Sequence, residues 1–195
     1  MKFLQSFCVV DSSLRILWVG GDWDEFARRN GGEAALANNI LSTRLTAHIV
    51  DLMTADKVLE MVQVVIETQR TLRLEYRCDA PHEVRRFLLT IKPMKDGRAI
   101  MVHELRDAVQ LDPPMQQWHY DPTARTQKCS TCGMVHRAEG WVDPAVSQIE
   151  HPPYVGYTTC PTCIARIDAA LKAIANGADE ADVQDFVFKS GIGIA

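Results

Sequence analysis

Short apolar runs separated by turn-forming residues open the chain. Residues 7–10 and 16–19 are apolar, and the polar residues 11–13 between them are typical of a turn. This pattern predicts an antiparallel β-hairpin. A short helix is predicted next, over residues 22–30, because Trp23 and two further apolar side chains share one side of it and two glycines follow.

The middle of the chain predicts one long amphipathic helix and three strands. Residues 33–53 have weak periodicity, and we expect short helices and loops there. After Thr54, which we expect to cap the helix, apolar residues recur at three- and four-residue spacing. Alternating apolar and polar residues then predict strands at 72–78 and 86–92, and a largely apolar run predicts a third at 99–105. Turn residues separate the three.

These elements predict an α+β fold followed by a smaller module. The chain has 195 residues and is 47% hydrophobic, which is enough for one domain with a substantial core and a small module, or for two small domains. Consecutive prolines at positions 113 and 114 prevent a helix or a strand from running through. The predicted parts are a sheet-and-helix domain (1–111), a linker (112–127), a four-cysteine module (128–177), and a short C-terminal helix starting at Asp179 with a tail (178–195).

Charge is divided unevenly between these parts. Residues 1–111 carry 15 Lys and Arg against 15 Asp and Glu, whereas residues 112–195 carry 6 against 10. Nucleic-acid binding draws most of its affinity from cations that neutralise phosphates, so an acidic C-terminal half argues against it. The apolar start of the chain is interrupted at Gln5, and we expect no membrane segment.

Two CxxC pairs are the residues in this sequence that most clearly indicate a chemical role. Cys129 and Cys132 form the first pair, Cys160 and Cys163 form the second, and 27 residues separate them. Four thiolates from two short segments match the tetrahedral, sulfur-rich shell that zinc prefers. A closed shell has no open position for a substrate. The spacing therefore predicts a structural zinc ion rather than a catalytic one.

The residues around the pairs support this interpretation. Gly133 follows the first pair and permits a positive φ, as a zinc knuckle requires. In the second pair Pro161 follows Cys160, and apolar residues then recur at helical spacing, so both cysteines are expected at a helix N-terminus that favours thiolates. A knuckle, a hairpin-length stretch and a ligand-bearing helix form the order of a treble-clef finger.

Other uses of the same thiols stay open at this point. The pairs could form a dithiol/disulfide switch, ligate an iron–sulfur cluster, or serve a thiol oxidoreductase, although no βαβ context for the last is found. Three histidines lie near enough in sequence to replace a cysteine ligand, but with four thiols present we expect them to be solvated: His119, His136 and His151. In a reducing cytoplasm, Cys8 and Cys78 are expected to be free buried thiols.

Residues 6–110 resemble a PAS domain, in which two strands, helices and three strands form a five-stranded antiparallel sheet with helices over one face. Residues 23–31 (WDEFARRNG) and 76–81 (YRCDAP) resemble a bacterial family in which a PAS-like domain precedes a C-terminal four-cysteine segment. That family usually has His-Gly-Ile before its Cys-Pro-x-Cys pair. This chain has the sequence YTT at 157–159, so no role of that histidine is carried over. The resemblance implies sensing or signalling.

These observations predict a cytoplasmic sensory or regulatory module rather than an enzyme. The sequence has no phosphate-binding glycine loop, nucleophile elbow or kinase signature. The PAS-like core could hold haem, flavin, a small metabolite or only its own side chains. If it holds haem, the candidate ligands are His48, His82, His103, Cys8 and Cys78. We expect the output to pass to a protein partner or a second copy of the chain, with no binding to nucleic acid or membrane.

Overall fold

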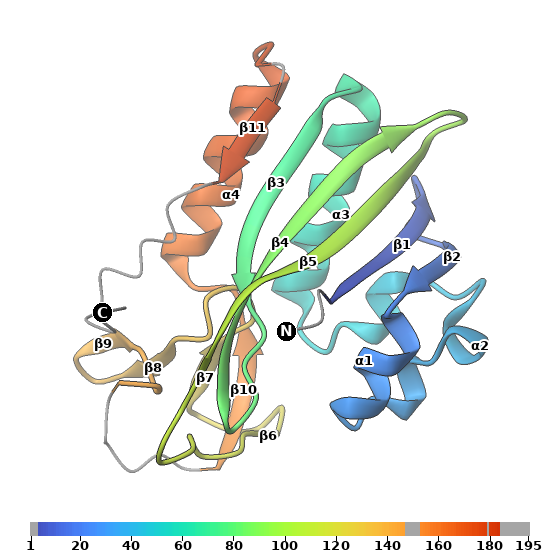
Figure 1. Ribbon diagram of the computed structural model, residues 1–195. Helices are drawn as coiled ribbons and strands as arrows, with labels where there is room; N and C mark the ends of the chain where they lie inside the picture. The colour runs from blue at the N-terminus through green and yellow to red at the C-terminus, as the bar shows by residue number, and fades with distance from the viewer. Residues whose placement is uncertain (1–3, 147–152, 179, 184–195) are drawn as a thin grey trace.

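A five-stranded antiparallel sheet organises the first half of the chain (Figure 1). The computed structural model describes residues 4–146, 153–178 and 180–183. The predicted hairpin is confirmed, because β1 and β2 pair antiparallel. The sheet has the order β3-β4-β5-β1-β2, and its strands are β1 (Gln5–Asp11), β2 (Ile16–Gly21), β3 (Thr71–Arg77), β4 (Glu83–Met94) and β5 (Arg98–Gln110). The predicted α+β fold with an antiparallel sheet is therefore confirmed.

Helices connect β2 to β3, as the sequence predicts. They are α1 (Trp23–Arg29), the 3-10 helix η1 (Glu33–Ala35), α2 (Ala37–Ile40), the 3-10 helix η2 (Leu45–His48) and α3 (Leu52–Thr68). Thr54 does not cap α3 as predicted. Asp51 does so, since its carboxylate accepts a hydrogen bond from the Thr54 amide at 2.9 Å, and an aspartate is a stronger N-cap than a threonine. None of the described helices is both long enough and apolar enough to cross a bilayer.

The second half of the chain adds a small sheet and one long helix. Its short strands have the order β6-β10-β7-β8-β9, and they are β6 (His119–Tyr120), β7 (Gln127–Cys129), β8 (Val135–Arg137), β9 (Gly140–Val142) and β10 (Tyr154–Thr158). Helix α4 (Pro161–Ala175) follows β10 directly and has proline in its first turn, as predicted.

The residues after α4 form a strand where the sequence predicted a helix. Gly177 has a φ of +106°, and the chain turns back there to run beside the sheet. Strand β11 (Glu180–Val183) pairs parallel with β3, the edge strand whose outer backbone groups would otherwise have no partner. The hydrogen bonds of this pairing stabilise a strand at residues 180–183, although the sequence pattern from Asp179 predicted a helix. Asp179 itself and residues 184–195 lie outside the described residues.

Helices α3 and α4 share a hydrophobic core with the large sheet. Buried residues from both helices and from all five antiparallel strands belong to one cluster, which includes Val62, Val65, Leu72, Ile91, Ile167 and Ile174. The cysteine-bearing helix is therefore packed on the sheet-and-helix part of the chain. The domain boundaries drawn from the sequence stay a prediction.

Truncation of Leu171, which is 5% exposed in α4, should show how much this shared packing contributes. We expect Leu171→Ala to lower the free energy of unfolding by about 2–5 kcal/mol, since it leaves a cavity in the core. The same change at Leu52, which is 82% exposed in α3, should cost less than about 0.5 kcal/mol. Urea unfolding of both variants measures the difference. Equal costs would mean that α4 is not packed in the core.

Candidate metal centre

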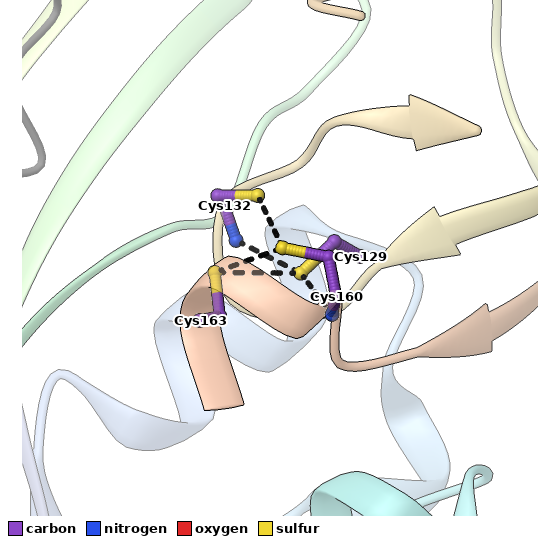
Figure 2. A group of neighbouring side chains, drawn as sticks. All are labelled: Cys129, Cys132, Cys160 and Cys163. Atoms are coloured by element: carbon purple, nitrogen blue, oxygen red, sulfur yellow. Dashed lines mark hydrogen bonds between the residues drawn. The ribbon is translucent and has the colours of Figure 1, made fainter. Parts of the chain in front are cut away.

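The four predicted cysteine ligands come together at one point. Cys129 ends β7, Cys132 lies in the turn that follows, and Cys160 and Cys163 lie at the start of α4 (Figure 2). Their sulfur atoms all lie within 4.8 Å of one another, and each residue is at most 4% exposed. The arrangement brings two segments of chain into one buried sulfur cluster.

Spacing between the sulfurs fits a single tetrahedral ion. The Sγ atoms of Cys129 and Cys163 are 3.8 Å apart, as are those of Cys132 and Cys160. A tetrahedron with metal–sulfur bonds of about 2.3 Å has edges of about 3.8 Å. All four cysteines are free thiols, and the shortest distance shown between their sulfurs, 3.3 Å from Cys160 to Cys163, is far beyond a disulfide bond. The residues therefore fit a metal ion in both donor type and spacing.

Backbone amides point at the sulfurs as well. Gly133 has the predicted positive φ, +76°, and its amide donates to the Cys129 carbonyl at 3.0 Å, which closes the turn. The amides of Cys132 and Cys160 donate to Cys129 Sγ at 3.5 and 3.3 Å. Such N–H groups stabilise a thiolate, because they supply positive charge without a counter-ion.

The proton affinities of the four thiols favour a cation at the cluster. Hydrogen bonds from the Cys132, Cys160 and Cys163 side chains lower the pKa of the Cys129 thiol well below its usual range. The pKa values of the Cys132 and Cys163 thiols are raised, first of all by their interaction with Cys129. Four thiolates so close together repel one another. A divalent cation between them offsets that repulsion and lets all four ionise.

An apolar cavity of about 270 Å³ adjoins the cluster, between α3 and the large sheet. The sheet contributes apolar side chains such as Leu74, Leu89 and Met101, and α3 contributes Val58 and Met61. This makes the cavity large enough for a small organic molecule and mostly apolar.

Two pairs of polar side chains also line the cavity. The Tyr76 hydroxyl and His103 Nδ1 are 2.9 Å apart, and burial lowers the pKa of His103 to about 4, so the ring is neutral at pH 7. The hydroxyls of Thr54 and Thr159 are also 2.9 Å apart. The cavity therefore offers uncharged hydrogen-bonding groups within an apolar surface.

No protein-family model and no curated protein matches the chain. Among solved structures, a domain of an HTR-like protein from Haloarcula marismortui ATCC 43049 is similar over 53% of this chain and 98% of its own length, with 18% sequence identity and a TM-score of 0.36.

The other candidate ligands lie apart from the sulfur cluster. His136 packs on the Trp141 ring at 5.1 Å, and His119 lies on β6, 5.9 Å from the Tyr154 ring. Neither joins the four cysteines within the described part of the chain, and His151 lies outside it.

Cys8 is buried, which raises its pKa to about 12, whereas Cys78 is half-buried. Of the three histidines considered for haem, His103 lines the cavity.

A buried ion network that the sequence did not reveal joins the cysteine turn to the sheet. The Arg77 guanidinium of β3 contacts the carboxylates of Asp79 at 2.6 Å and Asp143 at 2.7 Å. The Arg77 amide also donates to the Thr131 carbonyl at 2.8 Å. A Cβ atom on Gly133 would lie 3.0 Å from an Asp79 oxygen, so the turn fits closely against this network. In sequence, Arg77 looks like an ordinary polar position of an alternating strand.

Removal of one charge from this network should lower the stability of the fold. We expect Asp143→Asn to lower the free energy of unfolding by about 3 kcal/mol, because buried Arg77 loses one of its two carboxylate partners and keeps only Asp79. Asp168→Asn is the matched control. Its carboxylate contacts Lys57 at 2.6 Å but is 49% exposed, so the change should cost less than about 1 kcal/mol. Thermal or urea unfolding measures both, and a result in which the two variants lose equally little would contradict the role given to the network.

Proposed function

We propose that the protein is a cytoplasmic sensory or regulatory module, in which four cysteines hold a structural zinc ion and a PAS-like domain encloses a small-molecule site. The observation that carries the proposal is the convergence of four buried sulfurs, spaced for one tetrahedral ion, directly beside an apolar cavity. The metal stabilises the fold, and the cavity supplies the input. Output passes by contact with a partner protein or a second copy of the chain.

The element order supports a PAS-like domain. Two strands, a set of helices and three strands form an antiparallel sheet, which is the arrangement that the resemblance of residues 6–110 implies. The cavity lies between α3 and the sheet, where a bound molecule would contact both. A module of this kind needs no reacting groups, since its task is to change shape or stability on binding.

Zinc fits the sulfur cluster better than the other metal centres considered. It has no geometric preference beyond the tetrahedron, and a closed shell of four thiolates is typical of structural zinc. An iron–sulfur cluster contains several metal and sulfide atoms, and sulfurs within 4.8 Å of one another have room for a single ion. The knuckle at Gly133, the hairpin of β8 and β9, and the ligand-bearing start of α4 support a treble-clef finger.

A redox switch is the second candidate function. The Cys160 and Cys163 sulfurs are 3.3 Å apart, so oxidation could join them if the metal is lost. Burial of all four thiols argues against a thiol oxidoreductase, whose attacking sulfur must reach a substrate. Counting free thiols and bound zinc before and after mild peroxide treatment separates a redox-responsive site from an inert one.

An exposed apolar edge of the large sheet supports the expectation of a protein partner. Trp18 on β2 is 62% exposed, and Leu17 beside it is 40% exposed. Strand β2 ends the sheet on that side. Its first residue, Ile16, is hydrogen-bonded to Ser42 and Thr43, and Leu17 and Trp18 follow it on the strand. We propose that contact with a partner or a second copy uses this edge.

Elemental analysis tests the metal proposal. We expect protein purified under reducing conditions to hold one zinc per chain and to lack visible absorption from the cysteine site. Cys163→Ser should lose the zinc and unfold at a lower temperature, because one of four thiolates is gone and the start of α4 is released. Cys78→Ser, which alters a half-buried thiol outside the cluster, should keep the zinc.

Two results would contradict this proposal. If the purified protein contained iron and absorbed visible light, the cysteine site would be an iron centre and not a zinc site. A metal-free protein with reduced thiols and an unchanged unfolding temperature would remove the structural role of any metal.

A further inference from the structure

The wall of the cavity is built in part from the metal-binding segments themselves. Ser130 and Thr131 lie between the two cysteines of the first pair, and Thr159 directly precedes Cys160. All three residues line the cavity. A molecule in the cavity would therefore touch both segments that carry the sulfur ligands, although it would not touch the ion.

Hydrogen bonds join these same residues to the opposite wall. The Thr159 hydroxyl lies 2.9 Å from that of Thr54 in the first turn of α3. The Ser130 hydroxyl donates to Asp51, the residue that caps α3, at 2.9 Å. The start of α3 is thus tied to one residue beside Cys129 and to another beside Cys160. A shift of either metal-binding segment would move the helix that closes the cavity.

The groups around the cavity define the class of molecule that fits it. His103 is neutral at pH 7, and its Nε2 makes no hydrogen bond to any of the described residues. The Lys57 ammonium is already paired with Glu60 at 2.7 Å and Asp168 at 2.6 Å. An uncharged, largely apolar ring compound with one hydroxyl or carbonyl group matches these surroundings, because a charged ligand would find no free opposite charge.

We propose that the cavity binds an uncharged ring compound with one hydroxyl or carbonyl group and that this binding is thermodynamically coupled to zinc binding at the four cysteines. This inference rests on the proposed function, since it requires the metal. The coupling arises because one set of residues forms the cavity wall and holds the ligand sulfurs in place. Coupling of this kind is reciprocal: a ligand that raises the affinity for zinc has its own affinity raised by the same factor.

The test uses the full zinc-loaded chain with 2-naphthol as the probe, a fluorescent bicyclic molecule with one hydroxyl. Amide chemical shifts follow its binding, and competition with a zinc chelator of known affinity gives the zinc dissociation constant with and without it. We expect saturating 2-naphthol to raise the affinity for zinc by about 5-fold or more. Removal of zinc should weaken 2-naphthol binding by the same factor.

Two variants locate the coupling. Val58→Trp fills the cavity from α3, so 2-naphthol should no longer bind or change zinc affinity, while zinc content confirms that the chain is folded. Thr159→Val removes the link to Thr54, so the coupling should fall below about 2-fold. Thr90→Val is the matched control, since Thr90 is a buried threonine of β4 that does not line this cavity, and it should keep the full coupling.

The possible failures are distinguishable. Zinc-loaded protein that binds no 2-naphthol would overturn the ligand class and with it this inference. Binding with an unchanged zinc affinity would overturn the coupling, and the proposed function would stand. Protein that folds without any metal would overturn the proposed function itself.

Discussion

The structure depends on the placement of α4, which must meet two requirements. At its start, Cys160 and Cys163 must lie beside Cys129 and Cys132. Its later turns must pack in the core beside the large sheet. Figure 1 shows the helix running from the small sheet to the edge of the large one. Cys163 and Ile167 are one turn apart and serve these two requirements. The cysteine cluster and the hydrophobic core therefore position each other. The proposed cation would fix the start of the helix, and burial of its apolar side chains fixes its direction.

This constraint explains why the network around Arg77 is placed where it is. The turn that carries Cys129 and Cys132 has few apolar side chains with which to pack on β3, so charged groups hold it there. A buried arginine with two carboxylates contributes little net free energy compared with an apolar contact, but its geometry is specific. It sets the distance between the cysteine turn and the strand that leads to the cavity.

Much of this architecture could be predicted from the sequence because it follows from local patterns. Short apolar runs predicted β1 and β2, alternation predicted later strands of the large sheet, and helical spacing predicted α3 and α4. The two CxxC pairs identified the four sulfurs that converge. Long-range contacts escaped prediction. Nothing near Arg77 indicates its partner Asp143, 66 positions away. The pattern after Asp179 favoured a helix, and only the open edge of β3 explains the strand that forms.

The cavity gives this arrangement a functional meaning. Its walls come from parts of the chain that are distant in sequence, which include the sheet, α3 and the cysteine segments. A site assembled in this way exists only when these parts are correctly packed together. Loss of the proposed metal, or binding of a molecule in the cavity, would therefore affect the whole fold. In the proposed function, a partner bound at the far edge of the sheet would respond to the state of the core.

X-ray absorption at the zinc edge tests the central claim most directly, since it reads the first shell of the ion in solution. The account predicts four sulfur atoms at about 2.3 Å and no nitrogen or oxygen neighbour in the first shell. A shell with fewer than four sulfurs, or one completed by histidine or water, would contradict it.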